Sequence, residues 1–304
     1  MKIKKQFVWC MVVTILLLAL TGCSHSEIPQ MVNELQFSLD GISDVTISYD
    51  EESVTFFESD NDELIIKEYM TKNKNSYHAN VKQSSNSIHI SEGGKPFFKD
   101  GFLRYVEVYL PTSYMESLTV TTTDGNIDLC NMDLQLSTLR IDSTSGIVKL
   151  NNACASNIHL SSTSGTLKLG SIIADIIKLD TTSGNITCDE LIGNVTYTST
   201  SGNADIKSAI GSGSYKANNS GNLNVVYTEV TGDLFLFNKN DSIKLTLPAD
   251  LEFEFEATTK NGSISTTFPE CITIDGRTTR GTIGSNPTVT IKIETNNGNI
   301  EVTQ

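Results

Sequence analysis

Two pairs of oppositely charged residues are the first candidates for chemistry in this chain. Arg140 and Asp142 lie two positions apart, and Lys178 and Asp180 repeat that spacing further on. A polysaccharide lyase or a glycosidase would need paired carboxylates or basic residues close together for acid–base catalysis. Charges at alternate strand positions also form cross-strand pairs on a solvated face. We favour this charge ladder, so the sequence assigns no catalytic residue.

The other polar residues do not form a metal or cofactor site. The 4 histidines are scattered without HExxH spacing: His25, His78, His89 and His159. His89 and His159 alternate with apolar residues, so we expect them to be exposed on strands. Calcium-binding β-rolls place Asp at every turn, whereas the acidic residues here form no such column. The sequence also has no GxSxG and no phosphate-binding glycine loop. We therefore expect no metal and no cofactor.

The cysteines show neither a CxxC motif nor the spacing of a disulfide framework. Cys188 falls on an inward strand column, and Cys154 falls at an apolar corner. We expect both thiols to pack as small hydrophobic groups. Cys130 is expected to face outward.

The N-terminus has the pattern of a lipoprotein signal. Three lysines open the chain, and residues 7–20 form an apolar run that is too short for a transmembrane helix of the mature protein. The run ends in Leu20-Thr21-Gly22-Cys23, which resembles the bacterial lipobox. The resemblance implies cleavage after residue 22 and acylation of Cys23, which would anchor a soluble body at the extracytoplasmic face of a bacterial membrane. Ordinary secretion, or an uncleaved anchor, is the alternative.

A glycine-ended phrase recurs between residues 118 and 302. Thr-Ser-Gly occurs at 144–146, 163–165, 182–184 and 200–202, and related phrases extend the series with steps of 18 to 21 residues up to residue 262. A fixed period of this size indicates stacked repeats. Alternating apolar residues lie on both sides of each glycine, as in Val148 and Leu150. The sequence therefore predicts an all-β fold, a parallel β-solenoid whose coils each hold two short strands and an apolar corner within roughly 19–20 residues.

Three features of the repeat lead to separate predictions. The turn glycine is expected to supply a positive φ. Tyr215 and Ala217 lie one residue out of register before Gly221, which predicts a bulge or a shifted turn. The position two before the glycine is Thr at 123, 144, 163, 182 and 200. That column would suit a glycan or even ice, but β-branched Thr also suits an exposed strand, which is the interpretation we favour.

The domain organisation follows from the repeat and the leader. We expect a signal peptide over 1–22 and a polar tether over 23–34. Strand-like runs over 35–115 predict an irregular β segment that caps the solenoid, because an open end would expose unpaired edge groups. The repeat region covers 116–304 with an insertion at 268–287, which is expected to be a long loop or a capping strand.

The charge balance argues against nucleic acid as a partner. The chain has 22 basic and 36 acidic residues. Three lysines lie in the predicted signal, so the remainder has 19 basic residues and a net charge of −17. An acidic body repels nucleic acids and anionic lipid surfaces.

Four segments together resemble a known family. They are the strand Val45–Tyr49, the run Val106–Pro111 leading to Leu118–Ile127, the serial Thr-Ser-Gly turns and the closing run Thr295–Val302. This pattern resembles the adhesin-like family of unknown function found in bacterial envelope proteins, LiaG-like proteins among them. The resemblance implies a β-solenoid at the cell surface and no established catalytic residues. The lipobox differs from the membrane helix of LiaG-like proteins.

Three functional hypotheses follow. The first is a non-catalytic surface lipoprotein, held at the membrane by its lipid anchor, that binds an envelope protein or a glycan through its extended faces. The second, suggested by the LiaG-like resemblance, is an accessory or sensory component of an envelope-stress response. The third is a carbohydrate-active enzyme.

The lipobox hypothesis predicts that Cys23→Ser releases the protein from membranes, because the variant lacks the thiol that carries the acyl chains. Membrane and soluble fractions of cells would be compared by immunoblot, with the unaltered chain as control. A variant that stays membrane-bound and uncleaved would show that the hypothesis is wrong.

Overall fold

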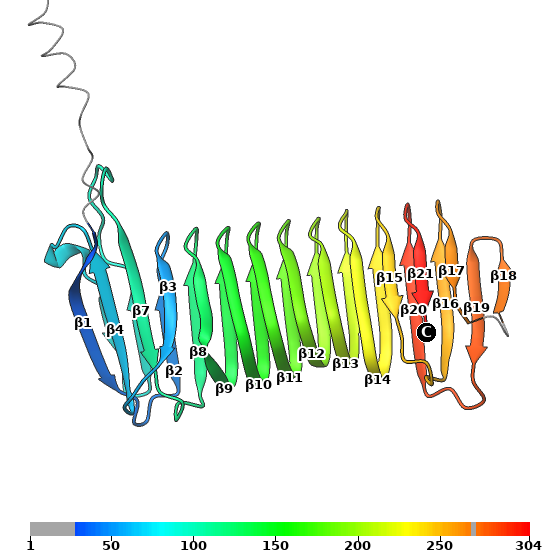
Figure 1. Ribbon diagram of the computed structural model, residues 1–304, viewed down its shortest axis with the longest axis horizontal. Helices are drawn as coiled ribbons and strands as arrows, with labels where there is room; N and C mark the ends of the chain where they lie inside the picture. The colour runs from blue at the N-terminus through cyan, green and yellow to red at the C-terminus, as the bar shows by residue number, and fades with distance from the viewer. Residues whose placement is uncertain (1–27, 269–271) are drawn as a thin grey trace, which may run out of the picture.

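Each repeat folds into one coil of a parallel β-solenoid, as seen in a computed structural model that describes residues 28–268 and 272–304 (Figure 1). Val148 lies opposite Leu167, and Leu167 lies opposite Ile186, in parallel ladders. These residues are 19 positions apart in sequence and form one buried column. The fold class predicted from the repeat is confirmed.

Six long strands form the central coils: β9 (Ile127–Ser143), β10 (Ile147–Ser162), β11 (Thr166–Thr181), β12 (Asn185–Ser199), β13 (Ala204–Ala217) and β14 (Leu223–Asn238). The sequence predicts two short strands per coil, whereas each coil here is one strand bent at the corner. The reason is that pairing continues through the bend, where Ala153 lies opposite Ile172 and Ile172 opposite Leu191. The bend therefore separates two sheet faces while strand pairing continues around it, with register shifts in some coils, such as the one between Ile173 and Ile176.

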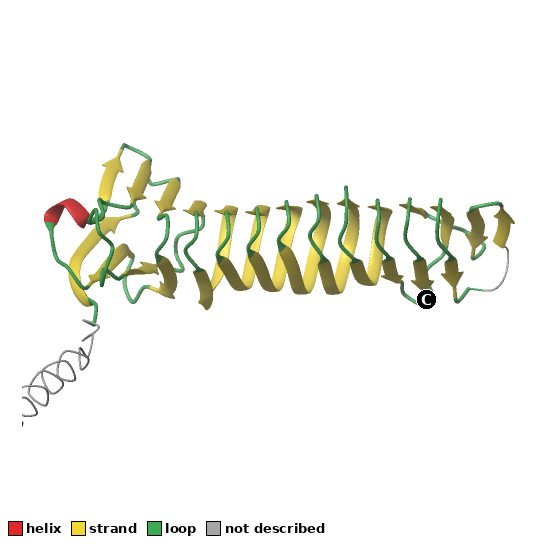
Figure 2. Cartoon of the chain, turned by 90° about the horizontal axis from the view of Figure 1, so that it is seen from above, coloured by secondary structure: helices red, strands yellow, loops and turns green. Residues whose placement is uncertain are grey.

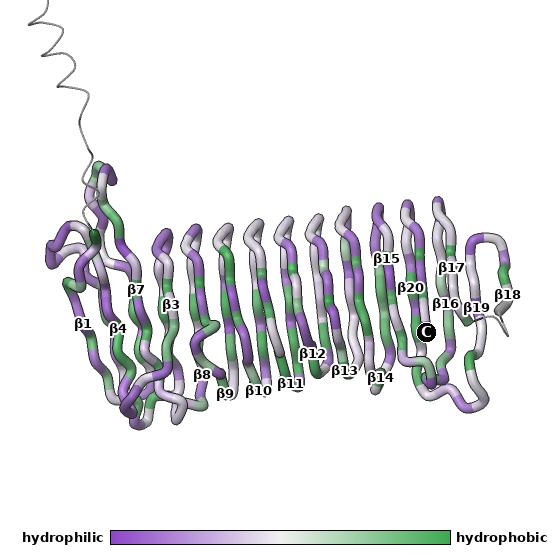
Figure 3. Tube along the Cα trace, in the orientation of Figure 1, coloured by the Kyte–Doolittle hydropathy of each residue, from purple (hydrophilic) through white to green (hydrophobic). Residues whose placement is uncertain are grey.

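The core fills the space between the two faces, and hydrophobic residues alternate with hydrophilic ones along the coils (Figure 3). At the corner, the expectation for Cys154 is wrong. Ala153 and Ala155 take the inward positions, and strand alternation leaves Cys154 exposed between them. Cys188 is buried and Cys130 exposed, as predicted, and burial raises the pKa of the Cys188 thiol to about 12.

The turn glycines are required by close contact between coils. A Cβ on Gly146 would lie 1.8 Å from the carbonyl oxygen of Gly125, and one on Gly184 would lie 2.4 Å from that of Gly165. The expected positive φ is found at Gly221 but not at the glycines of the four Thr-Ser-Gly turns, Gly146, Gly165, Gly184 and Gly202. Glycine is therefore needed because the turns stack too closely for any side chain, and the φ explanation is wrong for the regular turns.

A column of buried hydroxyl groups lies just inside the turns. It consists of Thr122, Ser143, Ser162, Thr181 and Ser199. The hydroxyl of Thr122 accepts a hydrogen bond from Gly125 N–H (2.9 Å), and that of Thr181 donates to the Gly184 carbonyl (2.9 Å). The side-chain amide of Asn238 likewise donates to the Gly221 carbonyl, at 2.7 Å. Thr122, Thr181, Ser199 and Asn238 thus satisfy turn groups that face the core. The hydroxyls of Ser143 and Ser162 have no hydrogen-bond partner among the described residues.

The exposed Thr column lies in the turns and not on the strands, contrary to the strand-based interpretation. Backbone bonds nevertheless continue from turn to turn, for example from Ser164 N–H to Thr144 O and from Ser183 N–H to Thr163 O, both at 2.7 Å. The turns consequently form one straight row along an edge of the solenoid (Figure 2). The shift before Gly221 is also in a turn, because Tyr215 pairs in register with Tyr197.

The N-terminal end is built by eight strands and one short 3-10 helix. They are β1 (Gln30–Ser38), β2 (Asp44–Ser48), β3 (Ser53–Glu58), β4 (Glu63–Met70), η1 (Asn75–Tyr77), β5 (Asn80–Gln83), β6 (Ser87–Ser91), β7 (Arg104–Leu110) and β8 (Ser117–Thr122). Residues 30–34, assigned to the tether from the sequence, belong to β1. Strands β2 and β3 form a coil that lies between β6–β7 on one side and β8–β9 on the other.

The C-terminal end repeats this interleaving. Its strands are β15 (Ile243–Thr246), β16 (Phe253–Thr259), β17 (Ile264–Thr266), β18 (Ile272–Asp275), β19 (Thr278–Ile283), β20 (Val289–Thr295) and β21 (Ile300–Thr303). The last coil in sequence, β20–β21, lies between β14–β15 and β16–β17. Strands β18 and β19 pair antiparallel, and β19 continues the sheet beyond β16. The end coils are thus paired on both sides by segments distant in sequence.

The close stacking predicts that Gly184→Ala destabilises the solenoid by about 1–3 kcal/mol, because the new methyl group forces two coils apart. Ser183→Ala, in the same turn but exposed, should change the free energy of unfolding by less than about 0.5 kcal/mol. Urea denaturation of both variants checks this. Equal stability of the two variants would contradict the role assigned to the glycines.

Candidate binding surface

The one site residue assigned from the sequence, Cys23, lies outside the described residues, so its acylation stays a prediction. No helix within residues 28–268 and 272–304 combines the length and the apolar character needed to cross a membrane. The polar groups that could form a site lie on the surface of the solenoid.

The outer face formed by the second halves of β9, β10 and β11 carries a continuous polar network. Arg140 binds Asp142 through its Nε (2.6 Å to Oδ2), and the Ser161 hydroxyl donates to Asp142 Oδ1 (2.6 Å). Lys178 Nζ lies 2.8 Å from Asp180 Oδ2. The ladder register places these groups side by side on consecutive coils. The structure thus brings together both charge pairs singled out from the sequence, as a cross-strand ladder.

His159 links the two charge pairs. Its Nδ1 lies 2.7 Å from Arg140 Nη1, and its Nε2 lies 2.9 Å from Asp180 Oδ2. A guanidinium only donates hydrogen bonds, so Nδ1 must accept and Nε2–H must donate to the carboxylate. The imidazole is half-buried and not fully exposed as expected. Ser161 bonds Asp142 and His159 bonds Arg140 and Asp180, so these groups do not form a nucleophile–base pair.

A shallow hollow of about 450 Å³ adjoins this network, at the turn edge of β2, β8, β9 and β10. Six of its lining residues carry hydroxyl groups outside the core: Ser48, Thr121, Thr123, Thr144, Ser161 and Thr163. Tyr49, Thr122 and Ser143 also line it but are buried. The remaining two are Asp50 and Asp142. Thr121 donates to Ser48 at 2.8 Å. The hollow combines many hydrogen-bonding groups with two carboxylates, which suits a ligand rich in hydroxyl or amide groups.

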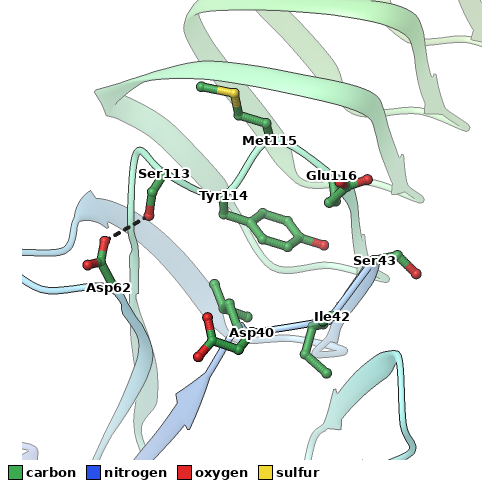
Figure 4. A pocket seen from close by; sticks show the side chains of 10 residues that line it. Asp40, Ile42, Ser43, Asp62, Ser113, Tyr114, Met115 and Glu116 are labelled. Carbon is green, nitrogen blue, oxygen red and sulfur yellow. Dashed lines mark hydrogen bonds between the residues drawn. The ribbon is translucent and has the colours of Figure 1, made fainter.

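A second hollow, of about 580 Å³, lies at the N-terminal end between residues 39–43 and 113–116 (Figure 4). Tyr114 lies at its centre and donates its hydroxyl to the Ser117 carbonyl at 2.8 Å. Burial, with the nearby Asp44 and Glu116, raises the pKa of Tyr114. Asp62 accepts a bond from Ser113 at 2.9 Å. The tyrosine hydroxyl and Asp62 are thus already engaged within the protein.

A buried charge cluster at the N-terminal end was not anticipated from the sequence. Arg104 is fully covered and bonds Glu52 (2.9 Å) and Glu92. Glu68, also fully buried, accepts bonds from Tyr49 (3.2 Å), Asn33 and the backbone of Ala79. One sequence feature could have revealed it: Arg104 and Glu68 occupy inward positions of strands in which buried and exposed residues alternate. Because the partners come from β1, the β2–β3 turn and the segments beside β5 and β6, the cluster joins the parts of the N-terminal end.

The same outer surfaces do not supply the usual elements of a metal centre. In the described part of the chain, no group of three His, Cys, Asp or Glu side chains is placed to hold a metal ion. Asp142 and Asp180, the two carboxylates of the network, are already paired with basic or hydroxyl groups. The arrangement can bind polar ligands through a preformed surface.

These features define a class: an elongated all-β protein built of parallel coils, with polar ladders outside an apolar core. Within that class the chain belongs to the Toastrack DUF4097 family, a domain of unknown function, which matches residues 42–303. The family resemblance stated from the sequence is thereby confirmed. A comparison with curated proteins finds no significant match.

Several crystal structures are similar along most of their length. A "putative adhesin" from Bacteroides fragilis has 12% identity and a TM-score of 0.49, covering 89% of this chain and 96% of that one. A "putative lipid binding protein" from Parabacteroides distasonis has 12% identity and a TM-score of 0.46, with 90% and 96% covered. A "putative adhesin" from the same species has 13% identity and a TM-score of 0.41, with 88% and 96% covered.

The network predicts that His159 exists as its Nε2–H tautomer near neutral pH, because Arg140 can only donate to Nδ1. Long-range ¹⁵N–¹H NMR would show an unprotonated Nδ1 in the unaltered protein. Arg140→Met leaves only the Asp180 carboxylate to favour this tautomer, so the fraction of His159 protonated at Nδ1 should rise. A protonated Nδ1 in the unaltered protein would contradict the network.

Proposed function

We propose that this protein is a non-catalytic, lipid-anchored binding module of the bacterial envelope. Its binding surface is the hydroxyl-lined hollow together with the adjoining network around Asp142 and Ser161. The ligand that fits this chemistry is an envelope glycan. The observation that carries the proposal is the hollow itself, in which hydroxyl groups and two carboxylates are held in register on successive coils.

The side chains of the proposed site are held in place before a ligand arrives, which supports binding without catalysis. Side chains are fixed by mutual hydrogen bonds, such as Ser161 to Asp142 at 2.6 Å and Thr121 to Ser48 at 2.8 Å. Groups positioned before the ligand arrives lose little conformational entropy when it binds. Shallow polar surfaces also suit a long polymer, which gains affinity from contacts repeated along adjacent coils.

The anchor belongs to the same proposal and rests on the lipobox at Cys23. Acyl chains on that cysteine would hold the acidic solenoid outside the bacterial membrane, where envelope glycans are accessible. The tether before β1 is short, since β1 begins at Gln30. The binding surface would therefore remain close to the membrane.

A matched pair of variants tests the binding surface. Asp142 and Asp128 both lie on β9, with 28% and 29% of their side chains exposed, and each pairs with a basic residue. Asp142 lines the hollow, whereas Asp128 lies on the other outer face. Asp142→Asn should weaken binding of purified envelope polysaccharide about tenfold or more, because a charge-assisted hydrogen bond is lost.

Asp128→Asn should leave the affinity within about twofold, as expected of an exposed residue away from the ligand. Affinity would be measured by sedimentation with insoluble envelope polysaccharide and by titration with soluble fragments. Equal effects of the two variants, or no binding by the unaltered protein, would contradict the proposed surface. Crosslinking in cells with the anchor intact would then identify a protein partner instead.

A further inference from the structure

The loop between β6 and β7 exposes two neighbouring phenylalanines. Phe97 is 93% exposed and Phe98 is 76% exposed, and their rings meet edge to face at 5.0 Å. Leu103, at the end of the same loop, is 53% exposed. Exposed apolar clusters of this kind mark contacts with a membrane or another protein.

The base of this loop is firmly held. Gly94 N–H donates to Ser76 O at 2.7 Å, and Phe102 N–H donates to Lys99 O at 2.9 Å. Phe102 packs edge to face on Tyr77, and the buried Arg104 donates to the Tyr77 carbonyl at 2.8 Å. The phenylalanine pair is therefore presented to solvent by a supported loop.

Strand pairing places this loop beside the start of the described chain. Gln30 pairs with Met70 on β4, and Met70 pairs with Arg104 on β7. Two strand spacings, about 10 Å, thus separate the first residue of β1 from the end of the loop. Figure 1 shows the loop leading into β7 rising above the row of turns, on the side where β1 begins. Ile28 and Met31, also at this end, are 78% and 52% exposed.

The predicted anchor lies within reach of the same end. Ile28 lies five positions after Cys23, and five extended residue steps span at most about 18 Å. If Cys23 carries acyl chains, the head-group region of the bilayer must lie close to the exposed phenylalanines. Because the predicted anchor would place the loop beside a bilayer, a lipid surface is the partner that fits the exposed phenylalanines.

Charge and aromatic composition fit that partner. Residues 67–104 contain seven basic and three acidic side chains. Arg104 is buried against Glu52 and Glu92, and Lys95 and Lys99 pair with Glu51. The exposed Lys72 and Lys74, on the connection beside the loop, add positive charge at this end. Lys72, on the connection after β4, donates to the Asp100 carbonyl at 3.1 Å, so one exposed lysine lies against the loop. Tyr69 and Tyr105 stack at 4.5 Å on the strands next to the loop. Lysine and tyrosine flanking an apolar tip are typical of segments at a membrane interface.

We propose that the β6–β7 loop inserts Phe97 and Phe98 into the membrane interface and forms a second contact beside the lipid anchor. This inference rests on the proposed lipid-anchored function and adds to it. The acyl chains hold the protein at the bilayer, whereas the loop fixes the orientation of the N-terminal end of the solenoid relative to the bilayer. The rest of the acidic solenoid is repelled from anionic lipid, which confines the contact to this end.

Tryptophan fluorescence tests the contact. The only Trp of the chain, Trp9, lies in the predicted signal, so Phe98→Trp would be a single probe in the mature protein. The acylated variant would be reconstituted into phosphatidylcholine–phosphatidylglycerol vesicles with lipids brominated near the head group. Its emission should shift to the blue and fall about twofold or more, because interfacial side chains reach the upper acyl chain.

Ile274→Trp is the matched control. Ile274 is 75% exposed on β18, in the hairpin that ends the opposite side of the solenoid. Its emission should stay solvent-like and unquenched. Quenching at both positions, or at neither, in acylated protein overturns the loop contact.

Mass spectrometry of the N-terminal peptide separates the two proposals. Quenching at residue 98 without acylation of Cys23 would support the loop contact and refute the anchor. Acylation without quenching would support the anchor and overturn the loop contact. Absence of both would overturn both.

Discussion

The close stacking of the turns is the constraint on which the rest of the structure depends. A Cβ on Gly146, Gly165 or Gly184 would lie within 2.4 Å of the carbonyl oxygen in the preceding turn. Glycine lets the backbones approach to the spacing of a β-ladder even where the chain reverses direction. Hydrogen bonds then pass from coil to coil through the turns as well as the strands. In the buried hydroxyl column, Thr122, Thr181 and Ser199 bond turn groups that face the core.

Because the coils are locked in register, their outer side chains form ordered ladders. Arg140, His159 and Lys178 share one ladder, and Asp142, Ser161 and Asp180 share the next. Each exposed ion pair contributes little to stability, about 0–1 kcal/mol. Its effect is to fix the positions of polar groups beside the hydroxyl-lined hollow. The same geometry that stabilises the core thus prepares a surface for recognition.

The two ends of the solenoid share an interleaved order of coils. At each end, a coil from one part of the chain lies between coils from elsewhere in the sequence, so it is paired on both sides. The N-terminal end differs by its buried charges and its projecting aromatic loop. Arg104 connects the two features, because it bonds Glu52 of the inserted coil and the backbone of Tyr77 beneath the loop. That end is therefore specialised, whereas the central coils are uniform.

The repeat period alone determined the solenoid, the partners of Val148 and the inward and outward alternation, because residues one period apart must stack when each coil cannot bury its own apolar side. It also placed the two charge pairs on one face. Only the tertiary structure decided the reason for the turn glycines, the exposure of Cys154 and the interleaved end coils. These depend on distances between backbones and on the order of coils in space, and neither is encoded in local periodicity. His159 joined the network for the same reason: its partners lie on neighbouring coils, 19 and 21 residues away.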